Sequence, residues 1–183
     1  MNYAVSTDDI IRLFGVQGIV FFPREEHSTA SGESPSMRFL HEVGLPHDDV
    51  FLSRVDTADT GQDSVLLGEA LSRQERPYPA AAERWLILGY FLDSFLALDP
   101  ASERVYAFPE GTNRYFPVHR NVESLVHALC ALQDFQLARD SVEDKQALAG
   151  ELRSKIGNFD DLPFVDPLSE WNIIYEEIIE GAW

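Results

Sequence analysis

The sequence predicts an α+β protein in which helices pack against one face of a mainly antiparallel sheet. Four short runs of apolar and aromatic residues follow one another over about residues 84–118, and only turn residues separate them. Capped helical patterns precede and follow these runs. Because parallel neighbours would need a crossover of a dozen residues or more, the close spacing favours an antiparallel meander. Strands in the middle and helices at the ends are typical of the α+β class.

The N-terminal part predicts a helix followed by a strand. Ser6 and Asp9 have the spacing of a capping box, so the first helix is expected to begin at Ser6 and to end at Gly15. Residues 16–22 are rich in β-formers and are followed by a proline, which predicts a strand.

A polar loop and a short helix come next. Residues 24–36 contain Gly and Pro among polar residues, which predicts an exposed loop. The short helix is expected over 36–43, because Gly44 stands in the C-cap position and Pro46 follows it.

The middle of the chain predicts the meander itself. Asp99-Pro100 is a favourable opening for a type I turn, and residues 110–113 form the next turn. Pro117 suits an edge strand or a strand end, because proline cannot donate to a neighbouring strand. The four expected strands span residues 84–89, 91–98, 104–108 and 114–118.

The C-terminal third predicts three helices. The first follows an Asn121 cap and carries one apolar stripe. The second is expected over 141–156, with Asp144 completing a capping box. After the linker 158–166, the last helix is expected to begin at Pro167 behind an Asp166 cap and to end near Glu180. The stripe of the first helix consists of Val122, Leu125, Val126, Leu129 and Leu132.

The composition limits the classes of partner. The chain has 183 residues, with 31 Asp and Glu against 14 Lys and Arg, and a formal net charge of -17. Nucleic-acid affinity depends largely on cations that displace counterions, so a chain without a basic cluster is not expected to bind nucleic acid directly. No uncharged stretch reaches the ~18–20 residues of a membrane span, and no signal-peptide pattern is present. We therefore expect a soluble, cytoplasmic protein without membrane contacts.

No common catalytic signature occurs in the sequence. Motifs for phosphate loops, dinucleotide binding, serine hydrolases and zincins are missing. The acidic stretch 56–63 lacks the Gly and Glu spacing of a calcium loop. Cys130, the single cysteine, lies beside the stripe of its helix, which favours a buried thiol over a nucleophile. The scattered histidines favour surface or capping roles: His27, His41, His47, His119 and His127. We expect no catalytic residue, no metal and no cofactor.

The last helix carries the clearest candidate for a binding surface. From residue 157 to the end there are seven acidic residues and no Lys or Arg. A helical wheel places an apolar side toward the core, with Trp171 at its start, and places Ile173 among the glutamates. The acidic side is either a solvated face or a contact for a basic partner. The expected partner-binding residues are Asp160, Asp161, Asp166, Glu170, Ile173, Glu176, Glu177 and Glu180.

Several segments together resemble a known family. They are residues 39–46 (FLHEVGLP), Leu88-Gly89, residues 96–100 (LALDP), Val105-Tyr106 and the helix opening over 121–129. Their order is similar to that of the SUKH superfamily of immunity proteins, type 4 branch. The resemblance is strongest over residues 37–132. We expect one SUKH-like domain over 1–183, with residues 141–183 as a helical C-terminal extension.

The resemblance implies a function as well as a fold. It implies a cytoplasmic immunity protein that neutralises a polymorphic toxin by binding its toxic domain. Toxins linked to this superfamily are often nucleases or nucleic-acid deaminases, and such domains are expected to be basic because they hold phosphate. The net charge of -17 agrees with a basic partner. The alternative is an acidic intracellular adaptor or regulatory protein-binding domain without catalysis.

Overall fold

The centre of the computed structural model is a five-stranded antiparallel sheet with the order β3-β4-β5-β6-β7. The structure describes residues 3–23, 33–53, 66–142 and 144–183. The predicted runs form β4 to β7, and each strand pairs with the next without an intervening helix, so the predicted meander is confirmed. The strands are β3 (Phe51–Ser53), β4 (Leu86–Phe91), β5 (Ser94–Leu98), β6 (Val105–Pro109) and β7 (Phe116–His119).

Side chains alternate between the two faces of the sheet, with the two-residue period of β-structure. On β5, Leu96 and Leu98 belong to the main core, whereas Phe95 and Ala97 lie on the opposite face. The turn into β5 falls after Phe91, so this residue ends β4 and does not begin the next strand as predicted. β7 is an edge strand, which agrees with the interpretation of its proline.

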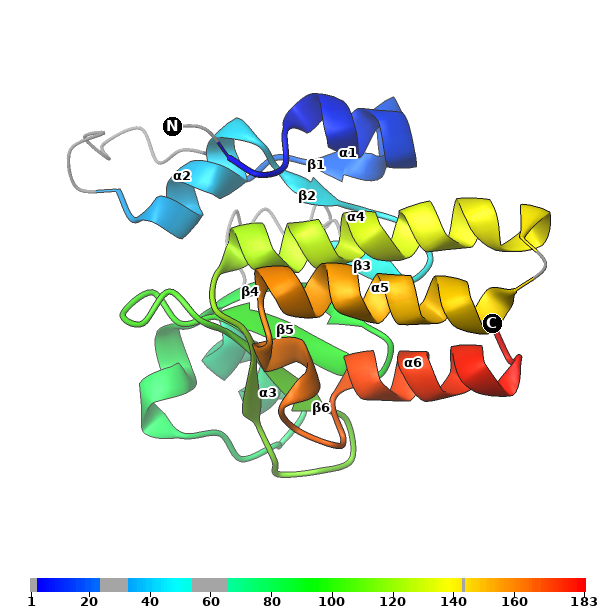
Figure 1. Cartoon of the computed structure of the whole chain (residues 1–183). Coiled ribbons are helices and arrows are strands. Elements are labelled where there is room, and N and C mark those ends of the chain that lie inside the picture. Colours follow the sequence, from blue (N-terminus) through cyan, green and yellow to red (C-terminus); the bar gives the residue numbers. More distant parts are fainter. Residues whose placement is uncertain (1–2, 24–32, 54–65, 143) are drawn as a thin grey trace.

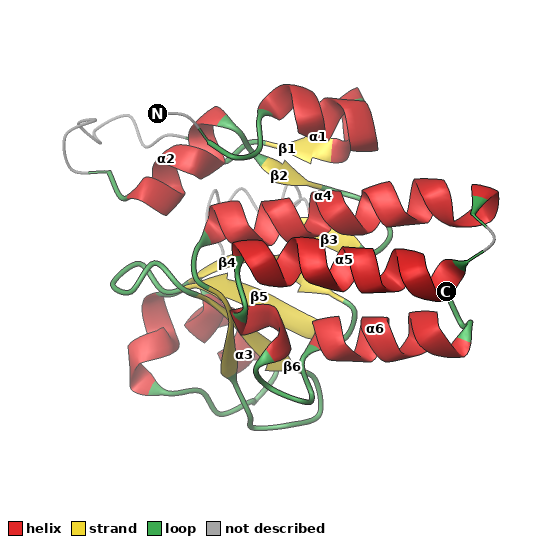
Figure 2. Cartoon of the chain, viewed as in Figure 1, coloured by secondary structure: helices red, strands yellow, loops and turns green. Residues whose placement is uncertain are grey.

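Three helices cover the core face of the sheet. They are α4 (Val122–Ala138), α5 (Lys145–Phe159) and α6 (Glu170–Glu180), and they lie side by side in Figure 1 and Figure 2. α4 begins after the predicted cap, because the Asn121 side chain accepts a hydrogen bond from the Ser124 amide at 2.9 Å. All five residues of its predicted stripe are buried. The predicted α+β arrangement is therefore confirmed.

The N-terminal helix follows its predicted cap closely. α1 (Thr7–Phe14) begins after Ser6, where both halves of the capping box are formed, and it ends at Gly15. The predicted strand over 16–22 is wrong for its first part, which forms the 3₁₀ helix η1 (Val16–Gly18). Only β1 (Ile19–Val20) remains, and it pairs with β2 (Leu45–Pro46) in a separate two-stranded sheet.

The next helix, α2 (Pro35–Glu42), begins behind a Ser34 cap, one residue earlier than predicted. Gly44 follows it with a φ of 85°, and a Cβ there would lie 2.9 Å from the Val20 carbonyl oxygen. Glycine is therefore required where α2 turns into β2. Residues 24–32 of the predicted loop and the acidic stretch 56–63 lie outside the described residues.

The second face of the sheet is partly covered by α3 (Leu67–Arg73) and the 3₁₀ helix η2 (Ala80–Arg84). Leu67 and Leu71 of α3 form a smaller apolar cluster with Trp85 and Phe108. A Cβ at Gly68 would lie 2.7 Å from the Glu83 carbonyl oxygen, so glycine allows α3 to approach η2. The predictions included neither α3 nor β3.

The helix boundaries of the C-terminal third differ from the prediction. α5 begins behind Asp144, and Ser141 instead ends the 3₁₀ helix η3 (Arg139–Ser141). α6 begins at Glu170 and not at Pro167, because Ser169 is the residue whose side chain caps it. The linker contains a further 3₁₀ helix, η4 (Leu162–Phe164).

Candidate partner-binding surface

Helix α6 is held against the sheet by the apolar side that the helical wheel predicts. Trp171, Ile174 and Ile178 are buried in the main core, and the Trp171 ring lies 4.9 Å from the Phe91 ring of β4. Ile179 is at the margin of this side, with 37% of its surface exposed. The opposite side of α6 is therefore the side that is presented to solvent.

A buried chain of hydrogen bonds lies beneath α6. The Trp171 indole donates to His119 Nε2 at 2.9 Å, so His119 carries its proton on Nδ1. Nδ1 lies 2.9 Å from Ser124 Oγ and donates to it, and the Ser124 hydroxyl donates to Asp160. These contacts join β7, α4, the end of α5 and α6.

This chain contains the residue types of a hydrolase triad in an unreactive arrangement. In a triad, histidine Nε2 faces the serine hydroxyl and the carboxylate holds Nδ1. Here the Ser124 hydroxyl lies between His119 and Asp160, and Trp171 occupies Nε2. All four side chains are buried, so the arrangement fixes the packing of the helices.

Asp160 is thus a structural residue, although the sequence placed it among the partner-binding residues. Only 5% of its surface is exposed, and its carboxylate accepts from the Arg120 amide at 2.8 Å. Burial alone would raise the pKa of Asp160, but the interactions with His119, Ser124 and the Arg120 amide outweigh it and hold the pKa well below its usual range. Burial lowers the pKa of His119.

Glu170 is also buried, with 3% of its surface exposed. Its side chain accepts a hydrogen bond from Ser94 Oγ of β5, and its other carboxyl oxygen has no partner among the described residues. Burial raises the pKa of Glu170, and the bond from Ser94 offsets part of this effect. Neither Asp160 nor Glu170 reaches the surface in this structure, so we remove both from the proposed contact set.

The other six predicted residues lie at the surface or near it. Asp161, Glu176 and Glu180 are exposed, and no ion-pair partner is found for them among the described residues. Asp166 pairs with Arg114 Nη2 at 3.0 Å, and Glu177 accepts from the Trp183 indole at 2.6 Å. Ile173 is 40% exposed, as the helical wheel predicts.

Exposed apolar side chains are concentrated in the same segment. In the described part of the chain, ten large apolar residues are exposed, and four of them lie within residues 165–179. Val165 and Leu168 are the most exposed of the four, at 65% and 57%. No pattern in the sequence marks these two residues, because they precede α6 and show no helical period. We call Val165, Leu168 and Ile173, together with Asp161, Asp166, Glu176, Glu177 and Glu180, the acidic C-terminal surface.

The other titratable candidates have structural contacts. His119 is completely buried, so the prediction of a surface or capping role is wrong for this residue. His127 stacks on the Phe159 ring at 4.2 Å, and the His41 side chain contacts Glu33. Among the residues that the structure describes, no group of three or more His, Cys, Asp or Glu is arranged to hold a metal ion.

Cys130 is buried, as predicted, and burial raises its pKa to about 12. Its thiol is therefore protonated and shielded at neutral pH. We predict that Cys130→Ser leaves partner binding unchanged and lowers the free energy of unfolding by about 1–2 kcal/mol, because a hydroxyl replaces a buried thiol. Urea unfolding and a thiol-reagent assay on the folded protein test this. A rapid thiol reaction in the native state would contradict it.

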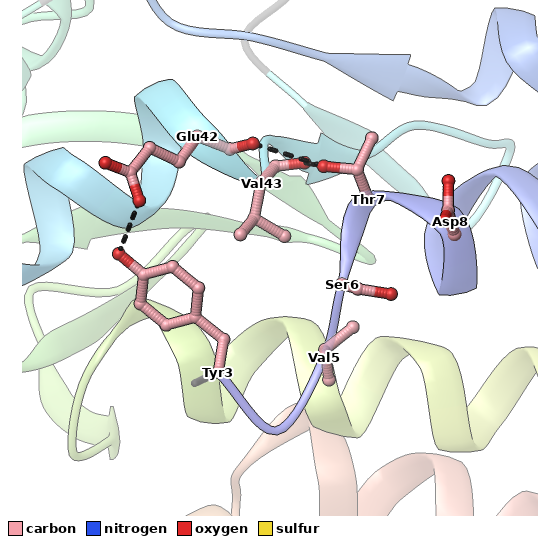
Figure 3. A pocket seen from close by; sticks show the side chains of 7 residues that line it. All are labelled: Tyr3, Val5, Ser6, Thr7, Asp8, Glu42 and Val43. Carbon is pink, nitrogen blue, oxygen red and sulfur yellow. Dashed lines mark hydrogen bonds between the residues drawn. The ribbon is translucent and has the colours of Figure 1, made fainter. Parts of the chain in front are cut away.

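A pocket of about 480 Å³ lies between the start of α1 and the end of α2, as Figure 3 shows. Its hydroxyl groups are already used in local contacts. Tyr3 donates to the Glu42 carboxylate at 3.1 Å, and Thr7 Oγ1 donates to the Glu42 carbonyl oxygen at 3.1 Å. Both bonds tie the N-terminal segment to α2, so the polar groups of this pocket stabilise the fold.

Fold and surface define an acidic α+β protein whose antiparallel sheet carries a layer of three helices, the last with apolar side chains exposed in an acidic surface. The model of the SUKH-4 immunity protein family matches residues 5–177, so the chain belongs to the SUKH-4 immunity protein family. Members of this family are non-catalytic antitoxins of polymorphic toxin systems, and they bind cognate toxin domains. The enzyme class that the motif search disfavoured is thus excluded.

The family match is longer than the resemblance over 37–132. It includes α1, the whole of α5 and most of α6, so the C-terminal helices belong to the matched region. Comparison with curated proteins and with solved structures found no significant match. None of the helices in the described ranges is both long and apolar enough to cross a membrane.

Proposed function

We propose that this immunity protein binds a basic nuclease or nucleic-acid deaminase toxin domain through the acidic C-terminal surface. It acts in the cytoplasm, where such a toxin meets its nucleic-acid substrate. The observation that carries the proposal is one segment that has five acidic residues at or near the surface, no Lys or Arg, and exposed apolar side chains. A domain that holds phosphate needs cationic side chains, and these complement such a surface.

The charges and the apolar side chains have different parts in this proposal. Complementary charges accelerate encounter and select the partner, while a few desolvated side chains supply much of the affinity. Ile173, Glu176 and Glu180 are spaced three and four residues apart, so they lie along one face of α6. The charged residues that accelerate encounter and the apolar residue that supplies affinity therefore lie on the same face of α6.

The genes beside this one are searched for a polymorphic toxin, and co-expression with the toxic domain of that toxin tests the proposal. The wild-type chain should restore growth of cells that produce the toxic domain, and the two purified proteins should form a complex. The domain should carry a net positive charge and should cleave or deaminate nucleic acid. A toxic domain that is acidic, or that acts on lipid or protein, would contradict the proposed partner class while leaving the family unchanged.

Charge reversal on α6 should slow association. We expect Glu176→Lys combined with Glu180→Lys to lower the association rate constant about tenfold at low salt and to flatten its salt dependence. Glu177 is kept, because it accepts a hydrogen bond from Trp183. Stopped-flow mixing with the inactivated toxic domain measures the rate.

A matched control distinguishes the effect of charge at the acidic C-terminal surface from the effect of the net charge of the chain. Asp140→Lys combined with Glu151→Lys changes the net charge equally, at two exposed positions outside the acidic C-terminal surface. The control should change the association rate constant less than threefold. Equal slowing by both double variants would show that only the net charge matters.

Truncating the apolar anchor should affect dissociation instead. We expect Ile173→Ala to raise the dissociation rate constant about tenfold and to leave the association rate constant nearly unchanged, because an anchor acts after encounter. Val16→Ala is the control, since Val16 is 70% exposed and lies in η1, outside the acidic C-terminal surface. Surface plasmon resonance measures both rate constants, and an unchanged dissociation rate in Ile173→Ala would remove this residue from the interface.

A further inference from the structure

A second recess lies beside the acidic C-terminal surface, between the segment after α3 and the turn that connects β6 with β7. It has a volume of about 140 Å³. Its apolar walls are Pro77, Tyr78, Pro79, Phe108 and Tyr115. The Tyr115 and Phe108 rings are stacked at 5.4 Å with an interplanar angle of 7°, and Tyr115 is 44% exposed. The recess is therefore walled by aromatic and prolyl rings and is open to solvent on one side.

The size of the recess limits its occupant to one side chain. A cavity of about 150 Å³ lined by apolar side chains holds a benzene ring. The recess of about 140 Å³ is therefore large enough for one aromatic or branched aliphatic side chain and too small for a helix or a nucleotide. Stacked aromatic walls favour such a side chain, because aromatic contacts add to the gain from buried area.

The positive charge of Arg76 beside the recess disfavours a cationic side chain, whereas the charge of Arg114 is paired with Asp166. Arg76 and Arg114 both line it. The Arg76 guanidinium donates to the Pro109 carbonyl oxygen at 2.7 Å, a neutral acceptor, so its positive charge is retained. A lysine or arginine that entered would be desolvated beside this charge. An apolar side chain has no such cost.

The recess is continuous with the acidic C-terminal surface. Arg114 pairs with Asp166 at 3.0 Å, so one ion pair forms the boundary between the two. Val165 and Leu168, on either side of Asp166, are the most exposed apolar residues of that surface. A partner that covers Asp166 therefore comes within reach of Tyr115.

We propose that the recess receives one aromatic or branched aliphatic side chain of the toxic domain as a specificity anchor. This inference rests on the proposed function, because the same toxic domain contacts the acidic C-terminal surface. Charge on that surface brings any basic domain near, whereas a shaped apolar recess distinguishes the cognate toxin from other basic domains. The acidic surface then sets the encounter rate, and the recess sets the lifetime of the complex.

Two substitutions test the recess by different means. Tyr115→Ala removes an aromatic wall, and Asn113→Trp adds a bulky side chain at an exposed position of the lining. Phe21→Ala is the matched control, since Phe21 is 49% exposed and does not line the recess. Binding is measured against the inactivated cognate toxic domain, after circular dichroism and urea unfolding show that each variant is folded.

The expected results distinguish this inference from the proposed function. We expect Tyr115→Ala and Asn113→Trp each to weaken binding at least tenfold through faster dissociation, and Phe21→Ala to change it less than twofold. Tight binding by the wild type with both recess variants unaffected would overturn the recess and leave the proposed function intact. Absence of wild-type binding to a basic toxic domain would overturn both.

A photocrosslinker identifies the occupant. With p-benzoylphenylalanine at position 115, irradiation of the complex should join this position to an aromatic or aliphatic side chain of the toxic domain, identified by mass spectrometry. A crosslink to lysine or arginine of the toxic domain would overturn the proposed chemistry. A crosslink between two copies of this chain would show that the recess is a self-association site and would overturn the proposal as well.

Discussion

Asp160→Ala should lower the free energy of unfolding by about 3–5 kcal/mol, because it leaves several buried hydrogen-bond donors without their acceptor. The side chain accepts hydrogen bonds from the Ser124 hydroxyl and the Arg120 amide, and also from the Leu162 amide at 3.2 Å. Its removal leaves these donors in a buried space without an acceptor. Each buried unsatisfied group costs about 1–3 kcal/mol, which agrees with the expected total.

The adjacent residue is a matched control. Asp161 has the same side chain at the next position, but it is exposed and no side-chain hydrogen bond is found for it among the described residues. Asp161→Ala should change the free energy of unfolding by less than about 0.5 kcal/mol. Urea unfolding at pH 7.5 measures both variants, and equal costs would show that the buried hydrogen-bond chain does not stabilise the fold.

The two variants should also differ in binding. Asp160 lies beneath the surface, so in conditions where Asp160→Ala stays folded it should bind the toxic domain nearly as well as the wild type. Asp161→Ala should bind more slowly without a loss of stability. Opposite effects on stability and on the association rate would distinguish an acidic residue that stabilises the fold from a neighbouring one that attracts the partner.

The meander and α4 could be predicted because their signals are local. A turn such as Asp99-Pro100 defines the connection between two strands, and an Asn121 cap defines where a helix begins. Each signal acts within a few residues, so the sequence alone contains enough information. The same reasoning explains why the capping box of α1 was predicted correctly.

The elements that were missed depend on contacts between distant segments. β3 has three residues and is a strand because it pairs with β4, which lies more than 30 residues further along the chain. α3 has no side-chain cap at Leu66, and its position depends on Gly68 packing against η2. No local pattern marks either element, because the stabilising partner comes from elsewhere in the sequence.

The helical wheel predicted the exposure of Ile173 but not the burial of Glu170. A wheel gives the direction of a side chain around its own axis, and it gives no information on what lies beyond the helix end. Glu170 is the first residue of α6, where the helix meets Ser94 of β5. The burial of Asp160 likewise depends on Ser124 and the Arg120 amide, which come from another part of the chain.

The buried titratable groups predict that the protein loses stability on acidification below about pH 6.5. Burial lowers the pKa of His119 and of His127, so the folded state resists protonation while the unfolded state takes up a proton at each imidazole. Stability is then complete above the unfolded pKa of about 6.5 and falls as the pH drops through it. Asp160 adds a loss in the same direction at lower pH, because its folded pKa lies below its unfolded value.

Glu170 acts in the opposite direction. Its pKa is raised on folding, so its contribution favours the folded state at low pH and is lost as the pH rises through the folded pKa. Glu170→Gln removes a buried charge that lacks a second partner. The free energy of unfolding of this variant, compared with that of the wild type, should therefore be about 1 kcal/mol higher at pH 8 than at pH 4. The stability of this variant should fall more steeply on acidification than that of the wild type, because Glu170 no longer offsets the loss caused by the histidines.

The histidine contribution can be measured as a slope. One proton taken up only by the unfolded state costs at most about 1.4 kcal/mol per pH unit, and the lowered pKa of His119 should therefore make the free energy of unfolding fall between pH 6.5 and 5. His119→Gln should be less stable than the wild type at pH 7.5, because its bonds to Ser124 and Trp171 are changed, yet its stability should depend less on pH over this range. Urea unfolding at half-unit pH steps gives both slopes, and parallel slopes would show that His119 is protonated as easily in the folded chain as in the unfolded one.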